Sequence, residues 1–174
     1  MNERNPIENI GNITTQMESS IAFLKQIDFE LAYLALLTRD SIKPLSRWEK
    51  PLEDRDLKSL EAMGLYTKRI KRTAKSEHII QENIFSLSYA HIELYAKRFD
   101  DKPIEKSDES QRFEGFLFGY PPCCIEQYIN KPYTKNKLDE KDQKILFHWA
   151  CNNCKITPFL LCNYKKTYEF VKNL

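Results

Sequence analysis

The sequence predicts a single compact domain that is mainly α-helical with a small β-hairpin, a description that an α+β fold also satisfies. A chain of 174 residues is long enough to bury one proper core. It holds only four glycines, which disfavours the many tight turns of sandwiches and barrels. Helical spacing of apolar residues dominates, and alternation is confined to one stretch. We therefore expect a helical N-terminal part (1–63), a hairpin region (64–90) and a cysteine-rich helical part (110–174).

The N-terminal part should contain one long, largely buried helix over residues 14–39, because apolar residues recur there at three- and four-residue steps. Two prolines make residues 41–53 a connector, in which Trp48 should be pinned to the core. A short helix over 54–63 should follow and end at Gly64, which suits a left-handed C-terminal cap.

After Gly64, the spacing of apolar residues changes from helical to alternating. In residues 65–73, few apolar side chains follow helical spacing. Residues 84–89 alternate apolar with small polar side chains, as a half-buried strand does. These two segments predict a β-hairpin with a long loop. Helical spacing resumes over 91–99, and a charged loop over 100–110 follows it.

Glycine and proline divide the C-terminal part into helices. A helix over 110–118 should end at Gly119, and Pro122 should open the next one, since its missing N–H would have no partner there. We expect another helix over 139–150. Thr157 should cap the last helix, with a proline at its first position.

The protein is expected in the cytoplasm and not in a membrane. Residues 1–6 show no apolar segment behind a basic start, and the longest apolar run is far too short to cross a bilayer. Thiols do not persist as structural disulfides in a reducing compartment, so an odd number of cysteines points to metal ligation or thiol chemistry.

All five cysteines lie in the last third of the chain, and the 122 residues before them contain none. They are Cys123, Cys124, Cys151, Cys154 and Cys162. Tyr120, His148 and Trp149 fall among them, and the two aromatic residues could shape or shield a pocket. This segregation suggests one local thiol-rich site.

The vicinal pair should occupy the first turn of the helix that Pro122 opens. Unpaired N–H groups and the positive end of the helix dipole would lower the pKa of both thiols there. Because neighbouring side chains diverge, we expect either Cys123 or Cys124 to be a ligand or nucleophile and the other to pack or to act as a resolving thiol. Alternatively, both are small core residues.

The second element is the spacing His148-x2-Cys151-x2-Cys154. On a helix the first two lie one turn apart on the same face, and a turn could bring Cys154 back beside them. Cys162 could complete a set of three thiolates and one imidazole or, together with Cys123 or Cys124, an all-thiolate set of four. Zinc is preferred over an iron–sulfur cluster, because zinc tolerates mixed histidine and cysteine ligands and is the commoner structural metal, whereas a cluster more often takes four cysteines. Cys162 could instead belong to a buried stripe with Phe159 and Phe170.

Two further functions stay open. In a thiol-dependent enzyme, Cys123 or Cys124 would be the nucleophile and His148 its base. In a nucleic-acid-binding adaptor, the basic run Lys68–Lys75 would contact phosphates, although such a run is more often a solvated strand edge and the net charge is only +2.

Other polar residues have less specific signals. Glu114 and Glu126 bracket the vicinal cysteines and could act as a base or an extra ligand, or they could be ordinary surface acids. His78 and His91 are isolated. The sequence contains no glycine-rich phosphate loop, no Ser-His-Asp signature and no His-Glu-x-x-His, so it suggests no substrate.

The segment 113–126 reads Phe-Glu-Gly-Phe-Leu-Phe-Gly-Tyr-Pro-Pro-Cys-Cys-Ile-Glu, and 147–154 reads Phe-His-Trp-Ala-Cys-Asn-Asn-Cys. Together they resemble a mainly archaeal family, known as a domain of unknown function, with a Gly-Tyr-Pro-x-Cys-Cys motif and a downstream His-x-Pro-Cys segment. Ala150 stands where that family usually has proline. The resemblance implies that the vicinal pair, His148, Cys151 and Cys154 belong together, and it implies no reaction.

Overall fold

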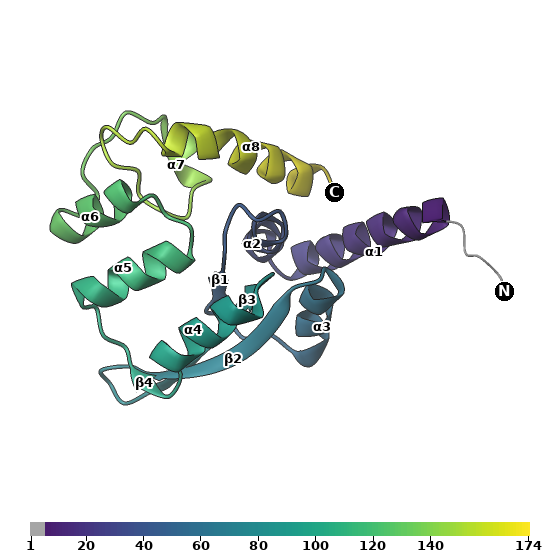
Figure 1. Ribbon diagram of the computed structural model, residues 1–174, viewed down its shortest axis with the longest axis horizontal. Coiled ribbons are helices and arrows are strands. Elements are labelled where there is room, and N and C mark those ends of the chain that lie inside the picture. The colour runs from purple at the N-terminus through teal and green to yellow at the C-terminus, as the bar shows by residue number, and fades with distance from the viewer. Residues whose placement is uncertain (1–5) are drawn as a thin grey trace.

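The computed structural model describes residues 6–174, and their side chains from residue 15 onward. A small mixed sheet of four strands lies among helices that make up most of the chain (Figure 1), which confirms the predicted fold class. In the described part of the chain, no helix combines the length and the apolar character needed to cross a bilayer. Residues 1–5, on which the expectation of no leader segment partly rests, lie outside this description.

The predicted helix over 14–39 is wrong in its continuity, because the structure divides it into α1 (Pro6–Ile27) and α2 (Phe29–Arg39). The break is Asp28, whose backbone is extended and whose side chain accepts a hydrogen bond from the Glu30 N–H at 2.9 Å. An aspartate is a preferred N-cap, so it begins α2 rather than continuing α1. The predicted burial holds for α2, which lies between α1, α8 and the sheet.

The predicted hairpin is confirmed as β2 (Tyr66–Thr73) and β3 (Ile79–Ser86), paired antiparallel. Its loop is shorter than predicted, because β3 begins before residue 84. Two short strands complete the sheet in the order β1-β3-β2-β4: β1 (Ser46–Trp48) pairs antiparallel with β3, and β4 (Lys102–Pro103) pairs parallel with β2. Both edge strands come from segments predicted as connectors.

Helices cover both faces of the sheet. On one face, α4 (Tyr89–Phe99) packs with Ile70 and Ile84, whereas Phe85 points to the opposite core, formed with α1, α2 and α3 (Asp54–Ala62). The sequence expectations for this region hold. Trp48 is buried in the same core as Phe85, and Gly64 after α3 has a φ of 83°.

The cysteine-rich part begins with two helices packed closely together, α5 (Asp108–Leu117) and α6 (Pro122–Asn130). Pro122 opens α6 as predicted, and Gly119 between the helices has a φ of 73°. A Cβ at Gly119 would lie 2.8 Å from Pro44 Cδ. This junction therefore holds the first turn of α6 against the segment before β1.

The predicted helix over 139–150 is wrong beyond its first turns, because α7 ends at Lys144 (Glu140–Lys144). The Gln143 side chain explains the end: its amide donates to the His148 carbonyl at 2.8 Å, and its oxygen accepts from the Ala150 N–H at 3.2 Å. These bonds hold the chain in an irregular path. The last helix, α8 (Thr157–Asn173), includes Thr157 in its first turn rather than as its cap.

Candidate metal centre

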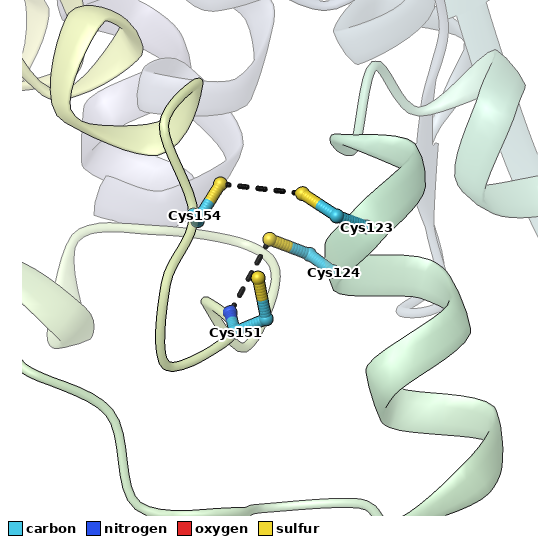
Figure 2. A group of neighbouring side chains, drawn as sticks. All are labelled: Cys123, Cys124, Cys151 and Cys154. Atoms are coloured by element: carbon cyan, nitrogen blue, oxygen red, sulfur yellow. Dashed lines mark hydrogen bonds between the residues drawn. The ribbon is translucent and has the colours of Figure 1, made fainter.

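Four of the five cysteines gather in one place. The sulfur atoms of Cys123, Cys124, Cys151 and Cys154 all lie within 4.8 Å of one another. Figure 2 shows the first two on the opening turn of α6 and the other two on the loop before α8, facing them. Cys123 Sγ and Cys154 Sγ are 3.6 Å apart. All four thiols are free of disulfide bonds.

Backbone N–H groups point at these sulfurs. The Cys151 N–H donates to Cys124 Sγ at 3.3 Å, and the Thr157 N–H donates to Cys154 Sγ at 3.2 Å. Cys123 and Cys124 lie at the N-terminus of α6, and Thr157 begins α8. The start of α8 thus faces Cys154, which favours negative charge on that sulfur.

Both members of the vicinal pair belong to this group. This contradicts the expectation that neighbouring side chains would diverge, because both sulfurs lie within 4.8 Å of the other two. Cys124 is buried and Cys123 is exposed. The loop carrying Cys151 and Cys154 lies beside the first turn of α6, and the side chains of Cys123 and Cys124 both point toward it (Figure 2).

The acidity of the thiols also differs from the prediction. Burial and hydrogen bonds with neighbouring thiols raise the pKa of Cys123 to about 11, and burial raises the pKa of Cys124 as well. Burial acts in the same direction on Cys154, but hydrogen bonds from the Thr157 hydroxyl and N–H outweigh it and lower the Cys154 pKa to about 7. The most acidic of the three is thus Cys154, and not a member of the vicinal pair.

His148 lies beside the group without joining it. Its Nε2 is 3.0 Å from Thr157 Oγ1, and that hydroxyl donates to Cys154 Sγ at 3.1 Å. Because the hydroxyl has a single proton, His148 Nε2 must carry the proton in its own bond to Thr157. Burial lowers the His148 pKa to about 4, so the ring is neutral at pH 7. His148 therefore orients Thr157, and Thr157 contacts the sulfur.

Cys162 lies apart from the four sulfurs, exposed on α8. The alternative of a buried stripe is also wrong, because Phe159 is 80% exposed and Phe170 is 40% exposed. Helix α8 instead buries other positions on its length, namely Thr157, Leu161, Tyr164, Thr167 and Val171.

The two glutamates around the motif serve other contacts. Glu114 Oε1 accepts from the side chains of Arg47 at 2.7 Å, Tyr95 at 2.9 Å and Arg72 at 3.0 Å. Glu126 binds Arg112 through both carboxylate oxygens on the exposed side of α6. This partly buried group around Glu114 could not be seen in the sequence, because its members come from four separate helices and strands.

Much of the basic run is engaged with acidic partners. Arg72 is buried at Glu114, Arg69 pairs with Asp54 at 2.7 Å, and Lys68 pairs with Glu93 at 3.0 Å. These three basic side chains therefore have acidic partners, whereas the sequence suggested a run of lysine and arginine side chains exposed to solvent. The two isolated histidines differ: His78 is exposed, whereas His91 Nδ1 is 3.3 Å from the Pro44 carbonyl oxygen.

A cavity of about 520 Å³ lies next to the cysteines. Cys124 and His148 line it, and so do Tyr120 and Trp149, the two aromatic residues expected to shape a pocket. The Tyr120 ring lies against the His148 ring, with centroids 5.3 Å apart. The cavity thus adjoins the thiol site on the side of Cys124.

No protein-family model matches this chain, and no curated protein or solved structure matches it either. The resemblance to the Gly-Tyr-Pro-x-Cys-Cys family therefore stays a hypothesis.

Proposed function

We propose that the protein binds one zinc ion through Cys123, Cys124, Cys151 and Cys154. The observation that carries this proposal is the mutual distance of at most 4.8 Å among four sulfurs from segments 27 or more residues apart. Zn–S bonds of about 2.3 Å in a tetrahedron place the sulfurs ~3.8 Å apart. The separation of 3.6 Å between Cys123 and Cys154 is close to that value.

Zinc is favoured over an iron–sulfur cluster by the size of the group. A cluster places several iron and sulfide atoms between its cysteine ligands, which would hold the thiolates farther apart than a single ion does. Thiolates are also ligands that zinc accepts in sets of four. The N–H groups of Cys151 and Thr157 support the negative charge that four thiolates bring.

The role of this zinc is structural. Four protein thiolates fill a tetrahedral site and leave no position for a substrate. The ion joins α6 to the loop before α8, in a region where α7 is short and the following residues are irregular. Its binding energy would therefore stabilise a part of the chain with little regular structure. A reducing cytoplasm would keep these thiols available.

Metal analysis of protein purified without oxygen tests this proposal. We expect one zinc per chain, and a lower melting temperature after removal by a chelator. Cys154→Ser should lose the metal, whereas the matched variant Cys162→Ser should retain it, since Cys162 lies outside the group. If the analysis finds iron together with visible absorption, the site holds an iron–sulfur cluster and not zinc. Metal-free protein, or equal zinc content in both variants, would refute the proposal.

A second candidate function is thiol chemistry, and one observation favours it. The Cys154 pKa of about 7 gives a substantial thiolate fraction at neutral pH, with the exposed Cys123 sulfur 3.6 Å away. In that case Cys154, rather than Cys123 or Cys124, would be the reactive thiol. Alkylation of metal-free protein, followed by peptide mapping, should then show Cys154 reacting with a midpoint near pH 7.

A further inference from the structure

Lys43 is buried in the interior without a carboxylate partner. Its side chain is 2% exposed, and its Nζ donates to the Phe118 carbonyl oxygen at 2.9 Å. Among the residues that the structure describes, no acidic oxygen forms an ion pair with it. A buried ammonium group without a counter-ion is unfavourable, so the position favours the neutral amine.

Three aromatic rings surround the Lys43 amine. Nζ lies 4.7 Å from the ring centroid of Tyr120, 5.4 Å from that of Phe147 and 5.7 Å from that of Phe118. Ring faces attract an ammonium group but do not neutralise it. Burial lowers the pKa of Lys43 to about 7, whereas exposed Lys50, 2.6 Å from Asp28, has a raised pKa.

Lys43 borders a cavity of about 270 Å³. Trp48 and Leu34 add apolar walls to those of the rings, and Phe118, Tyr120, Phe147 and Arg47 also line the larger cavity beside Cys124. The charged residues of the lining are Lys43, Arg47, Lys50, Glu30 and Glu49, and Glu49 binds Arg47 at 2.8 Å. With opposite charges nearly balanced, the cavity does not select strongly for an anion. Its volume suits a small molecule.

We propose that Lys43 is a nucleophilic amine that forms an imine with a small aldehyde or ketone bound in this cavity. The nitrogen lone pair attacks the carbonyl carbon and forms the C–N bond. The C–O bond then breaks, and the oxygen leaves as water with the two hydrogens of the amine. No electrons are gained or lost. A desolvated lysine is the form that reacts with carbonyl groups in this way.

The surroundings of Lys43 suit this step. The hydrogen bond to the Phe118 carbonyl oxygen holds the nitrogen in place. The rings of Tyr120 and Phe147 offer an apolar surface to the body of the ligand and limit the access of water. The contacts of Lys43 involve none of the four clustered cysteines. The inference therefore stands independently of the zinc proposal.

Reductive trapping tests the proposal on the full chain as isolated. Acetaldehyde and sodium cyanoborohydride are added at pH 7, and peptide mass spectrometry follows ethylation at each lysine over time. Lys43 should react at least about tenfold faster than Lys50, because a much larger fraction of its amine is neutral. Lys50 is a matched reference, since it lines the same cavity.

Two variants sharpen the result. Lys43→Met should abolish the fast modification without changing the metal content, whereas Lys50→Met should leave it unchanged. Ethylation of Lys43 no faster than that of Lys50 in the unsubstituted protein would overturn the proposal, and this comparison holds even when Lys43→Met does not fold. Fast ethylation that persists in Lys43→Met would overturn it as well.

Discussion

At the scale of single residues, Thr157 contacts the thiol site through both its hydroxyl and its N–H without being one of the cysteines. Its hydroxyl accepts from His148 and donates to Cys154, and its N–H donates to the same sulfur. Cys124 Sγ also lies 3.7 Å from its hydroxyl oxygen. Hydrogen bonds of this kind around metal ligands orient them and stabilise their charged form.

We expect Thr157→Val to weaken the proposed zinc binding by about 10- to 100-fold, the usual effect of removing such a partner. Valine keeps the shape and the N–H, so the loss reports on the hydroxyl alone. The Cys154 pKa should rise from its value of about 7, because one of the bonds that lower it is gone. Competition with a chromophoric chelator measures the affinity, and alkylation of metal-free protein measures the pKa.

Thr167→Val is the matched control. Thr167 is also buried on α8, but it lies nearly three turns along the helix from Thr157 at roughly 3.6 residues per turn. The zinc affinity of the Thr167→Val variant should equal that of the unsubstituted protein. Similar losses in the two variants would show that the effect arises from packing of α8 and not from the bond to Cys154.

At the scale of helices and strands, the junction between α5 and α6 determines where the vicinal cysteines lie. Gly119 has a positive φ, and a side chain there would approach Pro44 Cδ to 2.8 Å and the Ile42 carbonyl oxygen to 3.3 Å. Gly115 of α5 similarly leaves room for Ile125 of α6. Glycine at these two positions allows α6 to begin close to the segment before β1.

Gly119→Ala should lower the free energy of unfolding by about 2–4 kcal/mol. Roughly 1 kcal/mol comes from the positive φ, and about 1–3 kcal/mol comes from overpacking against Pro44. Gly64→Ala separates these contributions, because Gly64 also has a positive φ but no atom lies within 4 Å of its added Cβ. It should lose only about 1 kcal/mol. Urea unfolding measures both values, and equal losses would contradict the role given to the Pro44 contact.

At the scale of the whole molecule, Lys43 links global stability to pH. The unfolded chain holds the Lys43 proton up to a pKa near 10.5, whereas the folded protein holds it only up to about 7. Unfolding therefore takes up a proton between these values, and the stability from this residue is lost as pH falls toward 7. The free energy of unfolding should rise with pH by at most about 1.4 kcal/mol per pH unit in that window.

We expect this dependence to disappear in Lys43→Met. Between pH 7.5 and 9, the unsubstituted protein should gain up to about 2 kcal/mol of stability relative to that variant. Urea unfolding of both proteins at the two pH values measures the difference. Effects of pH on the thiols are common to both proteins and cancel, so parallel pH profiles would show that Lys43 is protonated in the folded state.

Much of this organisation could be predicted from local patterns. Three- and four-residue spacing indicated the helices, and alternation indicated the hairpin of β2 and β3. Gly64, Gly119 and Pro122 marked boundaries that the structure confirms, because the backbone preferences of glycine and proline depend on the residue itself. The segregation of five cysteines indicated where a thiol site lies.

Other features depend on contacts between distant residues. Asp28 breaks a helix that its neighbours favour, and Gln143 ends α7 through bonds to residues beyond it. The edge strands are two and three residues long, so pairing with β2 and β3 creates them. A pattern of single residues does not show such partners in advance.

By itself, the sequence determined that this is a mainly helical protein with a hairpin and a thiol-rich C-terminal part. Only the tertiary structure decided that four cysteines meet while Cys162 stays apart, that His148 acts through Thr157, and that Lys43 is buried without a counter-ion. The physical reason is that helix and strand preferences arise within a few residues of the chain. Acidity, ligand sets and buried charges arise where packing brings together side chains far apart in sequence.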